Sequence, residues 1–373
     1  MKLRKWWLAG VVVTVLGTTG PALAQQVPAT DPDFPRGRIS GLVYADVYYN
    51  VAGDPTHTYT GTTDAAKPSI DGATSASGNP NLTGKDLNGV LIRRIYFQAD
   101  NDLSIKYATR FRLEADSKSL TSDGKIGVNV KAAYLQAKNV YPGGNLFVGM
   151  LPTPIFENAE ELWGYRSLEK TIADFRGLAS SADLGFETKG SLDSGKKLQY
   201  ALMVGNGVGQ KPETNRYKRV YFALPVRPND MFLIEPYIDY EAGPHGEEHT
   251  LYKGLLGIDT RRATLGLEVV DRINHLPGAA TTEPFGISAY ARGRLNPQLA
   301  WVLRYDRWQP NTRLANRIDS DLYIAGVDWE PFKDVHLIPN VEATQYRARG
   351  TAVAPSHHDL QARITVYYRF SKP

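Results

Sequence analysis

Cysteine is absent from all 373 residues, so no disulfide can stabilise any part of this chain. Beyond the first 24 residues, no apolar run approaches the roughly 18 residues that a membrane-spanning helix requires. A long helical heptad pattern is also missing. The formal net charge is only +4, which gives no electrostatic case for a nucleic-acid partner. These absences leave an all-β chain, either soluble or embedded in a membrane as a barrel.

The N-terminus has the pattern of a secretory signal peptide. Lys2, Arg4 and Lys5 form a basic start, residues 6–17 form an apolar run, and "ALA" precedes Gln25. This predicts cleavage after residue 24 and export from a bacterial cytoplasm. Removal of the three basic residues lowers the net charge from +4 to +1. Residues 25–37 are then a short periplasmic lead-in, and residues 38–373 are the working domain.

Alternation of apolar and polar residues recurs along the whole domain and predicts about sixteen strands. The predicted strands are 38–50, 89–100, 103–116, 128–139, 145–151, 183–190, 197–205, 217–227, 231–240, 251–260, 262–271, 284–294, 299–309, 320–330, 335–346 and 361–370. Strands of this kind have two unlike faces, one apolar and one polar.

The connections between these strands alternate between long and short. Long connections are predicted at 51–88, 117–127, 152–182, 206–216, 241–250, 272–283, 310–319 and 347–360, with tight turns between them. All long loops then lie at one end of the sheet and all short turns at the other. Outer-membrane barrels have short periplasmic turns and longer extracellular loops, whereas a soluble sandwich has no reason to sort them. The pattern therefore predicts a transmembrane antiparallel β-barrel.

The residue types on each face indicate which face meets lipid. In the second and third strands, Phe97, Phe111 and Leu113 share the apolar face, and charged residues occupy the other. Tyr and Trp residues gather at strand ends, among them Trp308, Trp329, Tyr367 and Tyr368, as in the aromatic girdles of membrane barrels. The polar faces should line a water-filled lumen. The predicted pore-lining residues are Arg94, Lys106, Arg110, Arg112, Glu114, Asp116, Arg304 and Asp306.

Residues 91–207 contain several motifs of one known family. "LIRRIYFQAD" at 91–100, "AYLQAK" at 133–138, "GGNLFVGMLPTPIFENAEE" at 143–161, "RSLEK" at 166–170 and "GNG" at 205–207 carry the likeness. On these motifs the chain resembles outer-membrane porins of the phosphate-selective porin O and P type. The C-terminal half agrees with that family in architecture only.

This resemblance implies a diffusion porin of the Gram-negative outer membrane, a homotrimer, with the third loop at about 152–183 folded inward as a constriction. The charged candidates in this loop are Glu157, Glu160, Glu161, Arg166, Glu169, Lys170 and Arg176. Two departures bear on the solute. Tyr96 stands where the family commonly has a third arginine, and the loop holds more acids than bases. Both argue against tight phosphate specificity. The predicted solutes are small polar or anionic molecules, with phosphate as one candidate.

No motif for catalysis or a cofactor is found. There is no Gly-x-Ser-x-Gly, and no Ser/His/Asp set can be assembled by spacing. His245 and His249 are four residues apart, but Gly243, Pro244 and Gly246 break any helix that could present them to a metal. The sequence therefore predicts a non-enzymatic channel without cofactor or metal, with membrane lipid and lipopolysaccharide around it. The alternative is a secreted soluble all-β protein, such as a glycan-binding module or a hydrolase.

Overall fold

The computed structural model describes residues 33–53, 85–116, 121, 123–353 and 358–372. The chain divides into two compact units, Met1–Phe34 and Pro35–Pro373, and only the second is considered below. The predicted signal peptide lies outside the described residues, as do most of the predicted lead-in and the middle of the first long loop.

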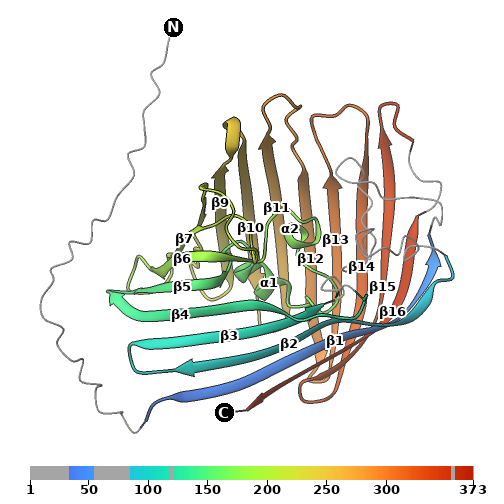
Figure 1. The fold of residues 1–373 in the computed structure, drawn as a ribbon. Helices are drawn as coiled ribbons and strands as arrows, with labels where there is room; N and C mark the ends of the chain where they lie inside the picture. Colours follow the sequence, from blue (N-terminus) through green and yellow to red (C-terminus); the bar gives the residue numbers. More distant parts are fainter. Residues whose placement is uncertain (1–32, 54–84, 117–120, 122, 354–357, 373) are drawn as a thin grey trace, which may run out of the picture. The chain divides into compact units, whose positions relative to one another are not determined.

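Sixteen strands form one closed antiparallel barrel in which each strand pairs with its sequence neighbours and β1 pairs with β16 (Figure 1). The strands are β1 Arg36–Ala52, β2 Asn88–Asp102, β3 Tyr107–Asp116, β4 Asn129–Tyr141, β5 Gly144–Pro152, β6 Ala182–Ser191, β7 Gln199–Gly205, β8 Arg219–Ala223, β9 Phe232–Ala242, β10 Glu248–Asp259, β11 Ala263–His275, β12 Phe285–Asn296, β13 Leu299–Gln309, β14 Arg317–Phe332, β15 Val335–Arg349 and β16 Asp359–Lys372. The predicted fold class and strand number are confirmed.

Two strand boundaries differ from the prediction for identifiable reasons. β3 begins at Tyr107 instead of residue 103, because residues 103–106 form the turn that follows β2. β8 ends at Ala223 instead of residue 227, and only Val226 makes isolated bridges beyond it. Pro225 lies at this break and has no N–H to donate to a neighbouring strand.

The connections sort to the two ends of the barrel much as predicted. We call the end with the connections 53–87, 117–128, 153–181, 206–218, 243–247, 276–284, 310–316 and 350–358 the loop end, and the opposite end the turn end. The exception lies in the middle of the chain. The loop-end connection 243–247 is shorter than predicted because β9 and β10 extend into it, and the turn-end connection 224–231 is longer because β8 stops early.

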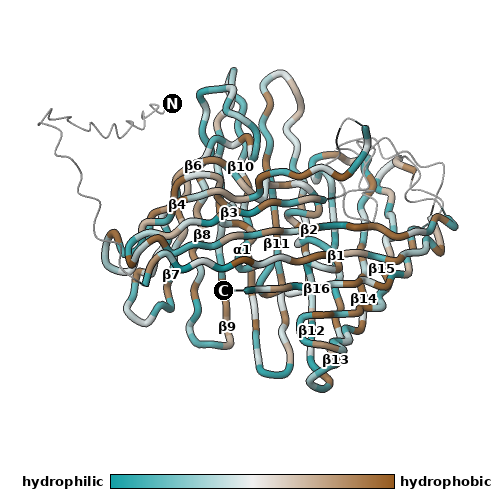
Figure 2. Tube along the Cα trace, turned by 60° about the horizontal axis from the view of Figure 1, so that its bottom comes forward, coloured by the Kyte–Doolittle hydropathy of each residue, from teal (hydrophilic) through white to brown (hydrophobic). Residues whose placement is uncertain are grey.

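The barrel wall is apolar outside and largely polar inside. Phe97, Leu265 and Leu303 are exposed on the outer face, whereas Arg94 and Glu114 are buried on the inner face. Figure 2 shows hydrophobic and hydrophilic residues alternating along the strands. Two aromatic residues do not follow the predicted girdle. Trp308 is buried inside beside Arg176, and Tyr367 lines an interior cavity.

The connection between β5 and β6 contains two short helices, α1 Glu157–Trp163 and α2 Ile172–Phe175. Glu157 and Glu160 lie in the first turn of α1, where carboxylates interact favourably with the helix dipole. Gly164 ends α1 at a φ of 69°, a left-handed conformation that favours glycine. Another connection contains the 3₁₀ helix η3, Pro244–Gly246. Within the described residues, no helix has the length and apolar character to cross a membrane.

Candidate functional site

The connection at residues 153–181, called loop 3 here, lies within the ring of strands (Figure 1). Its two ends are closed against each other, since the Thr153 N–H donates to the Ser181 oxygen at 3.3 Å. The Thr153 hydroxyl donates to the Ser180 oxygen at 2.6 Å. Between these residues the chain crosses the lumen and contacts strands of the opposite wall.

An apolar cluster joins loop 3 to that wall. Trp163 is fully buried, and its ring meets Tyr290 of β12 edge-on at a centroid distance of 5.2 Å. Leu255, Val302 and Leu322, from β10, β13 and β14, belong to the same cluster. Part of the inner wall that loop 3 covers is therefore apolar, unlike the inner wall beside β2 and β3.

Basic side chains of the same wall bind the main chain of loop 3. Four wall residues donate to loop oxygens: Lys253 to Ile155, Arg272 to Leu178 at 2.8 Å, Arg292 to Leu162 at 3.2 Å, and Arg304 to Lys170. Because loop carbonyls would otherwise be buried without partners, these bonds stabilise the inward path. Loop 3 thus closes the half of the lumen that faces β10–β13.

Ion pairs are buried beneath loop 3. The pairs are Lys253–Glu235 at 2.7 Å, Arg304–Asp306 at 2.6 Å and Arg363–Glu342 at 2.6 Å, and all six side chains are at most 1% exposed. The predicted pore-lining residues Arg304 and Asp306 therefore face inward but do not meet open space. Arg304 instead holds loop 3 through the Lys170 oxygen.

Between loop 3 and strands β1–β4 and β16 the lumen contains a cavity of about 450 Å³. We call it the opening. Its charged lining residues are Arg110, Arg112 and Lys131 on the wall, and Glu157, Glu160, Glu161 and Arg166 on loop 3. The lining therefore contains four bases, three of them on the wall, and three acids.

Arg112 is the wall cation with the fewest partners at the opening. Its Nε donates to the Gln98 side-chain oxygen at 2.6 Å, and its guanidinium lies 5.0 Å from the ring centre of Tyr96. Within the described part of the chain it makes no ion pair. Neighbouring Arg110 differs, because it pairs with Asp100 at 2.6 Å. Arg112 therefore presents a largely uncompensated positive charge to the opening.

The acids of α1 are each paired with a base. The pairs are Glu157–Lys189 at 2.6 Å, Glu160–Arg166 at 2.6 Å and Glu161–Arg227 at 3.7 Å. The charge of Lys189 lowers the pKa of Glu157, so this carboxylate is ionised at neutral pH. These pairs weaken the negative field of α1, but they leave Glu157 and Glu161 largely exposed to the opening.

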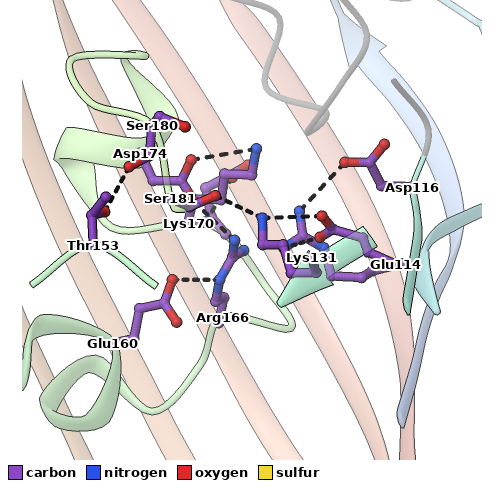
Figure 3. A network of polar contacts seen from close by, with 12 residues as sticks. Glu114, Asp116, Lys131, Thr153, Glu160, Arg166, Lys170, Asp174, Ser180 and Ser181 are labelled. Carbon is purple, nitrogen blue, oxygen red and sulfur yellow. Dashed lines mark hydrogen bonds and ion pairs between the residues drawn. The ribbon is translucent and has the colours of Figure 1, made fainter. Parts of the chain in front are cut away.

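A network of charges links the remaining loop residues to the wall (Figure 3). Asp174 pairs with Arg166 at 2.8 Å and Lys170 at 3.7 Å. Burial raises the pKa of Asp174, but the charges of Lys170 and Arg166 outweigh it and leave this pKa below its ordinary value. On the wall, Lys131 pairs with Glu114 at 3.0 Å and donates to the Ser181 hydroxyl at 2.6 Å. The network holds both ends of loop 3 beside the opening.

Two β-bulges turn additional basic residues toward the lumen. In β2, Arg94 pairs with Tyr44 and Ile92 pairs with Ala45, so Arg93 is an extra residue. In β4, Ala132 pairs with Arg112 and Val130 pairs with Leu113, so Lys131 is an extra residue. A bulge places two successive side chains on one face of a sheet. Arg93 therefore reaches Asp46 and the carbonyls of Ser167 and Leu168.

Sequence reasoning missed Arg93 and Lys131 because strict alternation assigns each to the outer face. The signal that could have identified them is a change in the spacing of the outer-face apolar residues. The outer-face residues Ile92 and Ile95 are three positions apart, although Val90 and Ile92 are two apart. Val130 and Ala133 show the same change across Lys131. In both strands a basic residue occupies the interval.

The other predicted residues are found in different settings. Arg94 pairs with Glu114 at 3.1 Å and with Asp116 at 3.9 Å, so all three lie on the inner face. Lys106 precedes the first residue of β3 and is exposed in a turn, so it is not part of the pore-lining strand face. Glu169 and Arg176 are both buried in loop 3, and neither lines the opening.

The two histidines of the predicted pair lie in different settings. His245 lies in η3, and the His249 Nδ1 contacts the Asn274 side-chain oxygen at 3.0 Å. Among the residues that the structure describes, no group of three or more His, Asp or Glu side chains could hold a metal ion.

No protein-family model matches the chain, and a comparison with curated proteins finds no match either. Solved structures share its fold. The outer-membrane channel DcaP of Acinetobacter baumannii has a TM-score of 0.63 at 11% identity, over 92% of this chain and 99% of that chain. The anion-selective porin from Comamonas acidovorans has a TM-score of 0.62 at 12% identity, over 90% of this chain and 100% of that chain.

A third similar structure is the outer-membrane protein OmpT of Vibrio cholerae. Its TM-score is 0.59 at 10% identity, over 91% of this chain and 98% of that chain. At such low identity these likenesses show the fold alone. The chain thus has the closed antiparallel barrel fold of known outer-membrane channels.

Removing Arg93 should destabilise the barrel markedly. Arg93→Met leaves Asp46, which is 1% exposed, without its cation, and an unpaired buried charge costs about 3–5 kcal/mol. Urea-induced unfolding in detergent micelles measures the loss. The double variant Arg93→Met/Asp46→Asn should recover most of it because no buried charge remains unpaired. An equal loss in the single and double variants would show that this ion pair is not the reason for the effect.

Proposed function

We propose that this protein is a porin of the Gram-negative outer membrane, through which small polar and anionic solutes diffuse passively. The observation that carries the proposal is loop 3. It closes one half of the lumen with apolar packing and buried ion pairs, and it leaves a charged opening along the other half. Such an arrangement selects solutes by size and charge and requires no reaction. Single-channel recording of the purified protein in a planar lipid bilayer tests it.

The outer face supports a membrane location over the soluble alternative. Large apolar side chains are exposed all around the barrel, including Phe97, Leu265, Leu303 and Val341. Soluble monomers rarely expose contiguous apolar patches of more than a few hundred Å². A secreted glycan-binding module or hydrolase would have this wall in water. In a bilayer the same wall meets hydrocarbon, and the loop end faces the exterior as in other outer-membrane barrels.

A charge placed on the outer wall should distinguish a membrane barrel from a soluble one. Leu303→Arg, on β13, is expected to destabilise the barrel by about 2–4 kcal/mol in a bilayer if it lies near the midplane. Refolding into phosphatidylcholine vesicles, titrated with urea, measures this. Val353→Arg is the control, because Val353 is 85% exposed in the connection 350–358. Equal stability of both variants would favour a barrel whose wall faces water.

The charges at the opening favour a modest preference for anions. Four bases and three acids line it, and each acid has a basic partner, whereas Arg112 has no acidic one. Charges farther away are screened beyond about 8 Å at physiological salt. We therefore propose phosphate as one of several permeating anions and not as a single specific ligand.

We also propose that the protein is a homotrimer surrounded by outer-membrane lipid. One solved structure of OmpT from Vibrio cholerae, which shares this fold at 10% identity, is described as a trimer form. The apolar outer wall leaves room for both lipid and subunit contacts. Mass measurement of the detergent-extracted protein, with the detergent contribution subtracted, tests the proposed subunit number.

A further inference from the structure

A group of arginines lies on the outer face of the barrel at the loop end. The group consists of Arg307 on β13, Arg317 on β14, and Arg347 and Arg349 on β15. These side chains surround two aspartates of β14. We call these six residues the arginine patch. The aspartates, Asp319 and Asp321, are 0% exposed, so the guanidinium groups form the surface of the patch. Four positive and two negative charges give it a net charge of +2.

Strand register shows that the patch belongs to the outer face. Arg307 lies on the same face of β13 as the exposed residues Tyr305 and Leu303, because successive members of this series are two positions apart. It is opposite Asp321 of β14. Asp319 is opposite Arg347 of β15. The inner-face neighbour Ser320 is instead buried beside Arg176 of loop 3. The arginine patch is therefore separate from the opening and cannot act on a solute inside the lumen.

The outer face changes in character from the patch toward the turn end. Next to the patch lie Tyr305 and Tyr323, with ring centroids 5.3 Å apart, and the Tyr305 hydroxyl donates to Asp321 at 3.0 Å. Beyond them are exposed apolar residues, Leu303 and Val341. The order is cationic, aromatic, aliphatic. It matches the order of headgroup, interface and hydrocarbon in one leaflet of a bilayer.

Two arginines of the patch keep unused donors. Arg347 contacts Asp321 through Nε at 2.5 Å, and Arg349 contacts Asp319 through Nε at 2.9 Å. Their side chains are 52% and 48% exposed, and among the described residues their terminal nitrogens donate no hydrogen bond. Arg307 pairs with both aspartates, at 3.0 and 3.1 Å, and Arg317 pairs with Asp319 at 2.8 Å, so two other cations match the two carboxylates. The fold therefore does not require the exposed arginines to neutralise the aspartates.

We propose that the arginine patch binds the phosphate groups of the glycolipid in the outer leaflet, with the acyl chains lying on the apolar wall below Tyr305 and Tyr323. This inference rests on the proposed function, because it needs the loop end to face the exterior. Guanidinium groups bind phosphate through paired N–H donors, and a net charge of +2 attracts an anionic headgroup. Free phosphate would gain no binding energy from the aromatic and aliphatic residues below the patch, which we call the apolar tiers. These tiers identify a lipid as the ligand.

Native mass spectrometry of the detergent-solubilised full-length barrel, titrated with bisphosphorylated lipid A, tests the proposal. Arg347→Gln/Arg349→Gln should weaken lipid A binding by about 25-fold, because each basic residue near an anionic lipid surface contributes about fivefold. Lipid A without its phosphates should bind the unmodified barrel about as weakly as phosphorylated lipid A binds the glutamine variant. Arg347→Lys/Arg349→Lys keeps both charges, so it should bind lipid A better than the glutamine variant and shows whether charge loss is the cause.

The matched control is Arg261→Gln/Arg262→Gln, which removes two exposed arginines from the turn between β10 and β11 at the turn end. It should bind lipid A as the unmodified protein does. Equal binding by the patch variant and the control would overturn the proposal. Displacement of lipid A by an equal concentration of inorganic phosphate would identify a free-anion site instead. Loss of subunit association without loss of lipid A binding would identify an interface between copies.

Failure of this inference can be distinguished from failure of the proposed function. Bilayer conductance of the glutamine variant should equal that of the unmodified barrel, because the patch lies outside the lumen. A conducting variant that binds lipid A normally refutes the lipid site alone. A folded barrel that binds lipid A but does not conduct refutes the channel alone.

Discussion

Replacing residues 154–179 with an Asn-Gly turn should raise the single-channel conductance by roughly twofold or more, because a sixteen-stranded barrel without an inward loop leaves a wide aqueous channel. The design uses the hydrogen bonds that join Thr153 to Ser180 and Ser181, since these residues already lie opposite each other. Asn-Gly is a favoured two-residue connection between antiparallel strands. Loop 3 is removed and the pairing of β5 with β6 is kept.

The control for this deletion shortens a loop that does not enter the lumen. Residues 211–216 of the β7–β8 connection are all exposed, so their removal should leave conductance unchanged. Heat-dependent gel mobility confirms that both variants form barrels. If the loop 3 deletion folds and conducts like the unmodified protein, loop 3 does not limit the flow of ions, and the proposed constriction is refuted.

Reversing the charge of Arg112 should abolish the proposed preference for anions and make the channel cation-selective. Arg112 lies on the lining of the opening without an acidic partner, so Arg112→Glu replaces the least compensated cation by an anion. The balance at the opening changes from four bases and three acids to three bases and four acids. Because nearby charges set the local field in a narrow passage, we expect a several-fold change in the permeability ratio of chloride to potassium.

The zero-current potential in a tenfold KCl gradient measures this change. Arg216→Glu is the control, since Arg216 is exposed in the β7–β8 connection and absent from the lining of the opening. It should keep the potential of the unmodified channel. An unchanged potential in the Arg112 variant would mean that ions pass by another route or that the selectivity arises elsewhere in the lumen.

The architecture could be predicted from the sequence because it depends on local periodicity. Each strand of a barrel has one face toward the lumen and one away, so alternation reports both its existence and its length. Errors arose where local chemistry interrupts the period. Pro225 shortens β8, and the bulges at Arg93 and Lys131 shift the phase within β2 and β4. Alternation alone cannot assign the residues beyond such a shift to the inner or the outer face.

The candidate site could be predicted only in part, because loop 3 decides which inner residues remain accessible. Arg110 and Arg112 line the opening, whereas Arg304 and Asp306 are covered. The covering depends on contacts between distant parts of the chain, which periodicity does not report. One sequence signal does exist. β10 has Leu251 and Leu255 on its inner face and Leu256 and Ile258 on its outer face. A strand apolar on both faces is covered by protein on its inner side.

Single-channel recording of the purified full-length protein in a planar bilayer tests the central claim most directly. The account predicts stepwise insertions of equal size, a current proportional to voltage, and a small zero-current potential of the sign for anion preference in a tenfold KCl gradient. Addition of phosphate at micromolar concentration should not block the current. A correctly folded barrel, verified by heat-dependent gel mobility, that produces no current steps would contradict the account.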